Sequence, residues 1–237
     1  MTLNISIAPI TSPATPSLGA AENFGVLANN YTNTIVGTTI NGDLGYTTAP
    51  AKMPTINGTT YTGADATYIQ ADTDQDTALS ALNAESCDYN FGSATDLSLL
   101  TQPLTPGVYC ITGAASIGGG GITLSGAGTY IFRINGALTT VAGSHVILTN
   151  GASACDVFWT PDAATTLGAN TTFIGTDIGG PGITVGANTL WIGRALNFDY
   201  TVSTDTDTIT VPTCTVGMRF SNDNVTRSSR MSYVATT

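Results

Sequence analysis

The sequence predicts a mainly β protein built as a three-sided solenoid of short strands. Of its 237 residues, 43 are threonine and 27 are glycine. Threonine favours strands because its side chain is β-branched, and glycine permits tight corners between them. A repeat supplies the second observation: TTLGANTTFIG at 165–175 returns as ITVGANTLWIG at 183–193, an offset of 18 residues (183 − 165). That offset suits one coil with about six residues on each of three faces.

Related tetrads mark further corners of the same solenoid. Each consists of an apolar residue, Gly or Ala, any residue, and then Thr, Ser or Asn; they occur at Val36–Thr39, Val141–Ser144, Leu167–Asn170 and Val185–Asn188. Their spacing is uneven, whereas a regular solenoid has one period from end to end. We therefore expect coils interrupted by insertions, the largest of which carries a helix between the first coil and the rest.

That helix is expected at about residues 64–84. An apolar stripe recurs there at spacings of three and four residues, as on one face of a helix; it comprises Tyr68, Ala71, Gln75, Ala78, Leu79 and Leu82. Thr62 and Asp65 are candidates for the N-terminal cap.

Composition limits the classes of function. Six basic residues against 16 acidic ones give a net charge of −10, and charged residues are only 9% of the chain. A nucleic-acid-binding surface is excluded, because it needs a patch of Lys and Arg. No apolar stretch reaches the roughly 18 residues of a membrane span.

The expected domain organisation has three parts. Residues 1–17 contain three prolines among Thr and Ser, lack the pattern of a signal peptide, and are interpreted as a flexible leader. Residues 18–213 form a single solenoid domain, because all-β domains of this size are common. Residues 214–237 are a C-terminal tail of unassigned role.

Four cysteines are too widely spaced for a paired zinc motif: Cys87, Cys110, Cys155 and Cys214. Two disulfides allow three connectivities. We favour Cys87 with Cys110 and Cys155 with Cys214, which indicates an oxidising compartment. The alternative is that some are buried free thiols.

Catalytic and metal-binding patterns are weak. His145 is the only histidine and no nucleophile elbow accompanies it, so an exposed strand residue is preferred over a catalytic triad. The glycine run at 118–121 lacks the lysine of a phosphate loop and is interpreted as a turn. Asp205 and Asp207 alternate with threonines; on a strand they would share one side, either as a solvated edge or, less favoured, as calcium ligands.

Several separate motifs, in a fixed order, resemble one known family. They are residues 18–28 (LGAAENFGVLA), 39–45 (TINGDLG), 104–109 (LTPGVY), 130–134 (YIFRI) with 138–140 (LTT), 154–159 (ACDVFW) and 193–196 (GRAL). This sequence, from about Leu18 to Val211, is similar to the microbial ice-binding (antifreeze) proteins.

The resemblance implies a right-handed, discontinuous β-solenoid of triangular cross-section with one long α-helix packed alongside. It also implies a secreted or cell-surface protein that binds ice crystals, inhibits recrystallisation and produces thermal hysteresis. No enzyme activity, cofactor or metal is expected, and a monomer is expected. In the family, one flat face carries Thr-Ala/Gly-x-Thr/Asn tetrads; here the first Thr is replaced by Val or Leu.

Strand alternation predicts which residues face ice. With Ile40, Val146, Phe173 and Trp191 inward, their neighbours should point outward, and the 18-residue offset should stack Thr171 on Thr189. The expected ice-binding residues are Thr38, Thr39, Asn41, Ser144, His145, Thr171, Thr172 and Thr189, and Thr123 is expected elsewhere. The alternative functions are a surface adhesin that binds glycans or calcium and, third, a carbohydrate-active enzyme.

Overall fold

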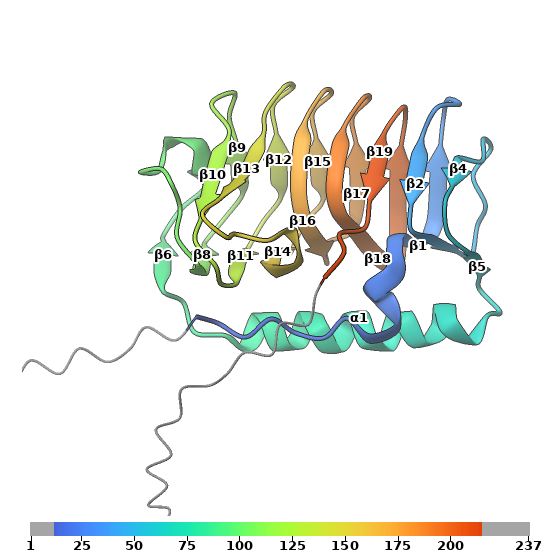
Figure 1. Ribbon diagram of the computed structural model, residues 1–237, viewed down its shortest axis with the longest axis horizontal. Helices are drawn as coiled ribbons and strands as arrows, with labels where there is room; N and C mark the ends of the chain where they lie inside the picture. The colour runs from blue at the N-terminus through green and yellow to red at the C-terminus, as the bar shows by residue number, and fades with distance from the viewer. Residues whose placement is uncertain (1–11, 215–237) are drawn as a thin grey trace, which may run out of the picture.

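The protein is a triangular β-solenoid with one long helix beside it, seen in a computed structural model that describes residues 12–214 (Figure 1). Seventeen of its strands form one continuous sheet that wraps around the solenoid, and two more form a small separate sheet. All the pairings between neighbouring strands are parallel, and the coils wind right-handed, as parallel crossovers almost always do. The expected fold class is confirmed.

The first face lies against the helix and is called the helix face. Its strands follow one another in space as β6 (Tyr89–Phe91), β8 (Gly107–Ile111), β11 (Tyr130–Ile134), β14 (Val157–Pro161), the end of β16 (Thr172–Ile178), the middle of β18 (Leu190–Thr204), the start of β1 (Phe24–Asn33), β3 (Asp43–Tyr46) and β5 (Thr60–Thr62).

The second and third faces complete the triangle. The second face consists of β7 (Thr95–Asp96), β9 (Ala115–Ile117), β12 (Leu138–Thr140), β15 (Thr165–Leu167), β17 (Gly182–Val185) and the last parts of β18 and β1. The third face consists of β10 (Ile122–Ser125), β13 (Val146–Thr149), the first parts of β16 and β18, β19 (Thr208–Thr210), β2 (Thr39–Asn41) and β4 (Thr55–Ile56). Short 3-10 helices are η1 (Gly19–Asn23), η2 (Leu97–Leu99) and η3 (Ala154–Asp156).

The order of coils in space differs from their order in sequence. Strand β1 pairs with β18 on one side and with β3 on the other, so the N-terminal coils extend the C-terminal end of the solenoid. In Figure 1 the colours accordingly run from green to red along the solenoid and then jump to blue. The solenoid is therefore discontinuous, as expected.

Helix α1 (Ala66–Ala84) joins the two ends of the solenoid, because β5 and β6 lie at opposite ends (Figure 1). Its 19 residues span about 28 Å. The predicted stripe is buried at five of its six positions, and Leu79 is half-buried. The helix begins at Ala66, two residues later than expected, because the Asp65 carboxylate accepts from the Thr62 N–H and hydroxyl and caps no helix amide.

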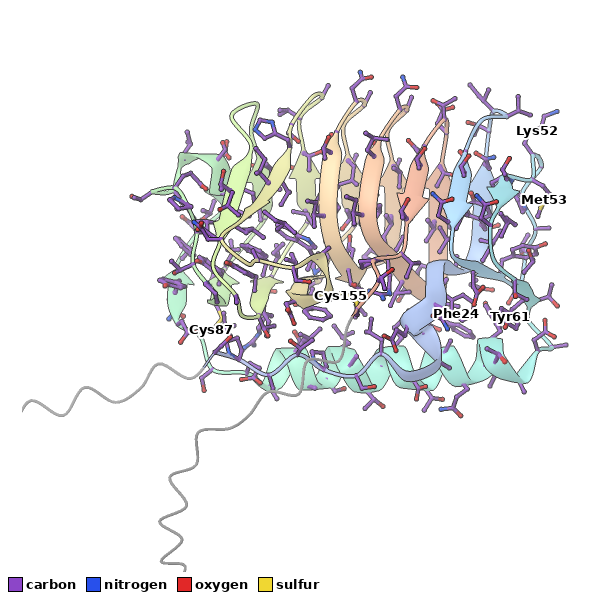
Figure 2. All side chains as sticks on the ribbon, in the orientation of Figure 1. Phe24, Lys52, Met53, Tyr61, Cys87 and Cys155 are labelled. Carbon is purple, nitrogen blue, oxygen red and sulfur yellow. A yellow bond between two sulfur atoms is a disulfide. The ribbon has the colours of Figure 1, made fainter. Side chains whose placement is uncertain are left out.

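Two apolar layers hold the fold together. Between α1 and the helix face lie Leu27, Val108, Ile131, Phe158, Ile178 and Leu196. Aromatic rings follow one another from coil to coil with centroid separations of 4.1–5.2 Å, from the exposed Tyr89 at one end through the buried Tyr109, Phe132, Trp159, Phe173 and Trp191; the last pair meets edge to face. Figure 2 shows Phe24 and Tyr61 together at one end, where their ring centroids are 5.4 Å apart.

Both predicted disulfides are confirmed. Cys87 is bonded to Cys110, and Cys155 to Cys214; Figure 2 places Cys87 and Cys155 on the side of the helix. The described part of the predicted leader is attached to the domain, since Thr15 donates to Asp156 Oδ1 over 2.6 Å. Residues 1–11 and the tail from 215 onward lie outside the described residues.

Candidate functional site

Two of the three faces are open to solvent. Helix α1 covers the helix face, whereas the described chain places no element across the second and third faces (Figure 1). A flat binding surface must therefore lie on one of these two.

The corner between the second and third faces is built by the repeated turns. Asn170 and Asn188 adopt left-handed backbone angles (φ 57° and 60°), which asparagine tolerates better than most residues. The next residue then turns inward: Thr171 donates to Gly168 O, and Thr189 to Gly186 O, each over 2.6 Å. Thr171 stacks on Thr189 as predicted, because Thr172 pairs with Leu190.

Four of the eight predicted ice-binding residues are therefore misplaced by the sequence argument. Thr38, Ser144, Thr171 and Thr189 are each no more than 1% exposed. The physical reason is the preceding corner residue, Gly37, Gly143, Asn170 or Asn188, whose positive φ changes the alternation that holds within a straight strand. At Thr171 and Thr189 the hydroxyl then points toward the backbone of its own turn. These side chains shape the corner and cannot contact a crystal surface.

The other four predicted residues share the third face. His145 bridges to Thr172, and Thr39 and Asn41 pair with Thr208 and Thr210 of β19. Neighbouring positions carry large aliphatic side chains, with Leu190 55% and Ile192 43% exposed. The third face is also interrupted, because β10 and β13 form their own two-stranded sheet.

Thr123 was expected elsewhere and is on the third face. It pairs with Ile147, and β13 is linked to β16 through the bridge from His145 to Thr172. The expectation failed because β10 carries none of the tetrads that were used to assign faces.

The second face carries the more regular surface. One outward position is a hydroxyl residue on six consecutive strands, and we call this set the hydroxyl row: Ser116, Thr139, Thr166, Thr184, Ser203 and Thr32. At about 4.8 Å between strands, the row is about 24 Å long. Its central members Thr139, Thr166 and Thr184 are exposed.

Small residues accompany the hydroxyl row two positions earlier on each strand. They are Ala114, Ala137, Ala164, Gly182, Thr201 and Asn30. Both sets lie in register on parallel strands, and neither contains a charged, aromatic or large aliphatic residue. Asp96 continues the hydroxyl row at the β7 end, where its Oδ1 accepts from Ser98 N over 2.9 Å and Gly118 N over 3.2 Å.

Sequence reasoning missed the hydroxyl row, although a signal exists. The triplets Ala137-Leu138-Thr139, Ala164-Thr165-Thr166 and Gly182-Ile183-Thr184 share one pattern, a small residue, an inward residue and an outward threonine. Each triplet precedes its corner turn. Because the prediction used the tetrads alone, it placed the ice-binding surface after the corner instead of before it.

Asp205 and Asp207 form neither a solvated edge nor a paired calcium site. They lie in the turn between β18 and β19, and Asp207 is fully buried. Its Oδ1 accepts from Thr189 N over 2.9 Å and its Oδ2 from Asp205 N over 2.8 Å. Burial raises the pKa of Asp207 to about 6, against the lowering effect of these hydrogen bonds.

Within residues 12–214, no group of three or more His, Cys, Asp or Glu residues is arranged to hold a metal ion. No helix in the same range is long and apolar enough to cross a membrane.

The fold and surface define a class: a helix-flanked parallel β-solenoid that presents a flat, uncharged array of small polar side chains. The model of the ice-binding-like family matches residues 23–210. The chain belongs to this family.

Similar proteins are found by sequence and by structure. An ice-binding protein of Nostoc sp. (strain HG1) is 33% identical over 202 residues, which cover 81% of this chain and 72% of that protein. The crystal structure of an ice-binding protein from the Antarctic ascomycete Antarctomyces psychrotrophicus has a TM-score of 0.78 and 30% identity, over 85% of this chain and 100% of that one. An ice-binding protein from an Antarctic biological consortium has a TM-score of 0.74 and 28% identity, over 89% of this chain and 96% of that one.

Proposed function

We propose that this protein adsorbs to ice crystals through its second face and thereby slows ice growth and recrystallisation. The observation that carries the proposal is the hydroxyl row, which continues without a charge or a large side chain across six coils in a chain of the ice-binding-like family. The proposal needs no catalytic group, cofactor or metal.

Adsorption of this kind depends on many weak contacts. If about ten methyl-bearing groups each bury about 20 Å² against ice, the gain at roughly 25 cal/mol per Å² is about 5 kcal/mol. Threonine supplies both the methyl group for this contact and a hydroxyl that can anchor ordered water. A rigid backbone limits the entropy that is lost when the face meets a crystal.

The third face is the competing location, because it holds Thr39, Asn41, His145 and Thr172. We favour the second face since its hydroxyl row contains only serine and threonine, whereas the large aliphatic side chains of Leu190 and Ile192 are exposed beside the threonines of the third face. Only a face with level side chains can contact a flat lattice along its whole length.

A matched pair of substitutions distinguishes the two faces. Thr166→Tyr places a large ring in the middle of the hydroxyl row, and Thr172→Tyr does the same on the third face. We expect Thr166→Tyr to reduce thermal hysteresis several-fold and Thr172→Tyr to leave it close to that of the unmodified protein. Both sites are at the surface, so the unfolding midpoint should change little.

If Thr172→Tyr reduced thermal hysteresis more than Thr166→Tyr, the ice contact would lie on the third face, and the proposal of ice binding would stand. A folded unmodified protein without hysteresis or inhibition of recrystallisation would remove the proposed function itself. In that case the surface adhesin becomes the better hypothesis, and a calcium-dependent rise in melting temperature or affinity for a polysaccharide would support it.

We further propose that the protein acts outside the cell as a monomer. Its two disulfides support an oxidising compartment. Sedimentation of the purified protein as a 24.2 kDa species would agree with a monomer.

A further inference from the structure

A buried arginine lies at the seam between the two ends of the described chain. Arg194 on β18 is 1% exposed. Its Nε donates to Glu22 O in η1 over 2.6 Å, and its Nη1 donates to Thr176 Oγ1 over 3.3 Å. Among the described residues, its Nη2 contacts only the Cys214 sulfur, at 3.9 Å.

This guanidinium lacks a counter-ion at contact distance. Within residues 12–214, no carboxylate oxygen lies within 4.0 Å of it. A guanidinium carries five N–H groups, and oxygen atoms accept from two of them. N–H groups on Nη1 and Nη2 therefore remain without an oxygen acceptor among the described residues. A buried charge in this condition is costly unless an anion satisfies it.

The same side chain lines an open pocket of about 300 Å³. The pocket lies between η1, residues 211–214 and β18, since all three contribute lining residues. Its walls are both polar and apolar; they are formed by Glu22, Asn23, Arg194, Val211, Pro212, Thr213 and Cys214. Arg194 is thus part of the pocket wall.

We propose that this pocket binds a small carboxylate, which Arg194 holds through a two-pronged hydrogen bond. The planar fork of a guanidinium matches a carboxylate in spacing and geometry. Val211 and Pro212 line the pocket as apolar residues that suit a short hydrocarbon tail, and Asn23 and Thr213 line it as polar residues.

The negative charge of Glu22 indicates which class of anion the pocket prefers. Glu22 also lines the pocket, and its negative charge acts on Arg194 from a distance. A singly charged, planar anion adds less repulsion there than a doubly charged, tetrahedral one. We therefore assign the site to monocarboxylates in preference to sulfate or phosphate. This proposal is independent of the ice-binding face, because the pocket is formed by η1 and the C-terminal segment.

The experiment measures the full-length protein with sodium acetate as the probe, at constant ionic strength. Saturation-transfer NMR on the acetate methyl group reports contact, and thermal unfolding reports the linked stability. At ten times the dissociation constant, acetate should lower the unfolding equilibrium constant about elevenfold. Sulfate and chloride at equal ionic strength should give smaller effects.

Three variants make the test specific. Arg194→Lys keeps the charge without the fork and should abolish the acetate signal; Arg133→Lys, a partly exposed arginine that donates to Glu85 O, should not. Glu22→Gln removes the competing charge and should tighten acetate binding several-fold, which keeps the proposal testable if Arg194→Lys fails to fold. No saturable acetate signal, equal signals in Arg194→Lys and the unmodified protein, or weaker binding in Glu22→Gln would each overturn the site. A larger effect of sulfate would overturn the assignment to carboxylates.

Discussion

The environment of Asp177 is unusual for an acidic residue. It lies inside the solenoid next to the packed ring of Trp159, fully buried, and neither carboxylate oxygen has a hydrogen-bond partner within the described residues. Burial raises its pKa to about 7, and the lowering effect of the nearby Thr165 hydroxyl is the smaller of the two. The folded state therefore favours the neutral acid.

This environment predicts a pH-dependent stability. Because the pKa of Asp177 is about 7 in the folded protein against the ordinary 3.8 of an aspartate, the folded state binds more protons than the unfolded state between those pH values. Its contribution to stability is greatest below about pH 4 and is lost as the pH rises toward 7, by up to about 1.4 kcal/mol per pH unit.

Asp177→Asn should remove that slope. We expect the variant to unfold at a higher denaturant concentration than the unmodified protein at pH 8, and at nearly the same concentration at pH 4. Asp207, whose pKa is raised to about 6, remains in both proteins and leaves a smaller slope in the same direction. Parallel curves across pH 4–8 would show that Asp177 is ionised in the folded state.

Single residues also explain why only half of the predicted site lies at the surface. Alternation correctly placed Thr39, Asn41, His145 and Thr172 outward, because they lie on or beside straight strands. It failed after the left-handed corners at Asn170 and Asn188. A sequence motif shows that a turn is present, but the inward direction of the next hydroxyl depends on a hydrogen bond to the backbone of that turn.

At the scale of elements, α1 both covers apolar surface and connects the two ends of the solenoid. Deleting residues 64–84 should abolish cooperative unfolding, because β5 and β6 lie at opposite ends and the helix face would meet water. A cooperative transition with a similar midpoint after this deletion would show that the packing is dispensable.

A milder substitution measures the packing alone. Leu82 is 1% exposed between α1 and the helix face, so Leu82→Ala should cost about 2–5 kcal/mol of unfolding free energy. Ile69 lies on the same helix but is 53% exposed, and Ile69→Ala should cost much less. Denaturant titrations of both variants would check this, and equal losses would contradict the observed orientation of the helix.

The two disulfides should differ in effect. Cys155 and Cys214 are 59 residues apart, against 23 for Cys87 and Cys110. In the chain-entropy account, each bridge contributes about 2–4 kcal/mol, with about 1 kcal/mol more for the longer loop. Replacing Cys155 and Cys214 with serine should therefore lower the melting temperature more than replacing the other pair. The reverse order would show that local packing at Cys87 outweighs loop length.

At the scale of the whole molecule, the sequence predicted the coil repeat and the single helix, because both are local patterns. The pairing of β1 with β18 left no local pattern, since segments about 170 residues apart meet there; Thr32 donates to Ser203 over 2.7 Å with a separation of 171. The resemblance to a known family predicted that the solenoid is discontinuous. The continuous hydroxyl row exists only because that long-range pairing brings Thr32 into line with Ser203.

The most direct test of ice adsorption is the partition of fluorescently labelled protein between liquid and a slowly growing ice hemisphere. Ordinary solutes are pushed ahead of the ice front, whereas an adsorbing protein is overgrown. The flat, uncharged second face predicts that the unmodified protein accumulates in the ice and that Thr166→Tyr accumulates far less. Exclusion of the folded, unmodified protein from the ice, to the same extent as a labelled protein without affinity for ice, would contradict the account.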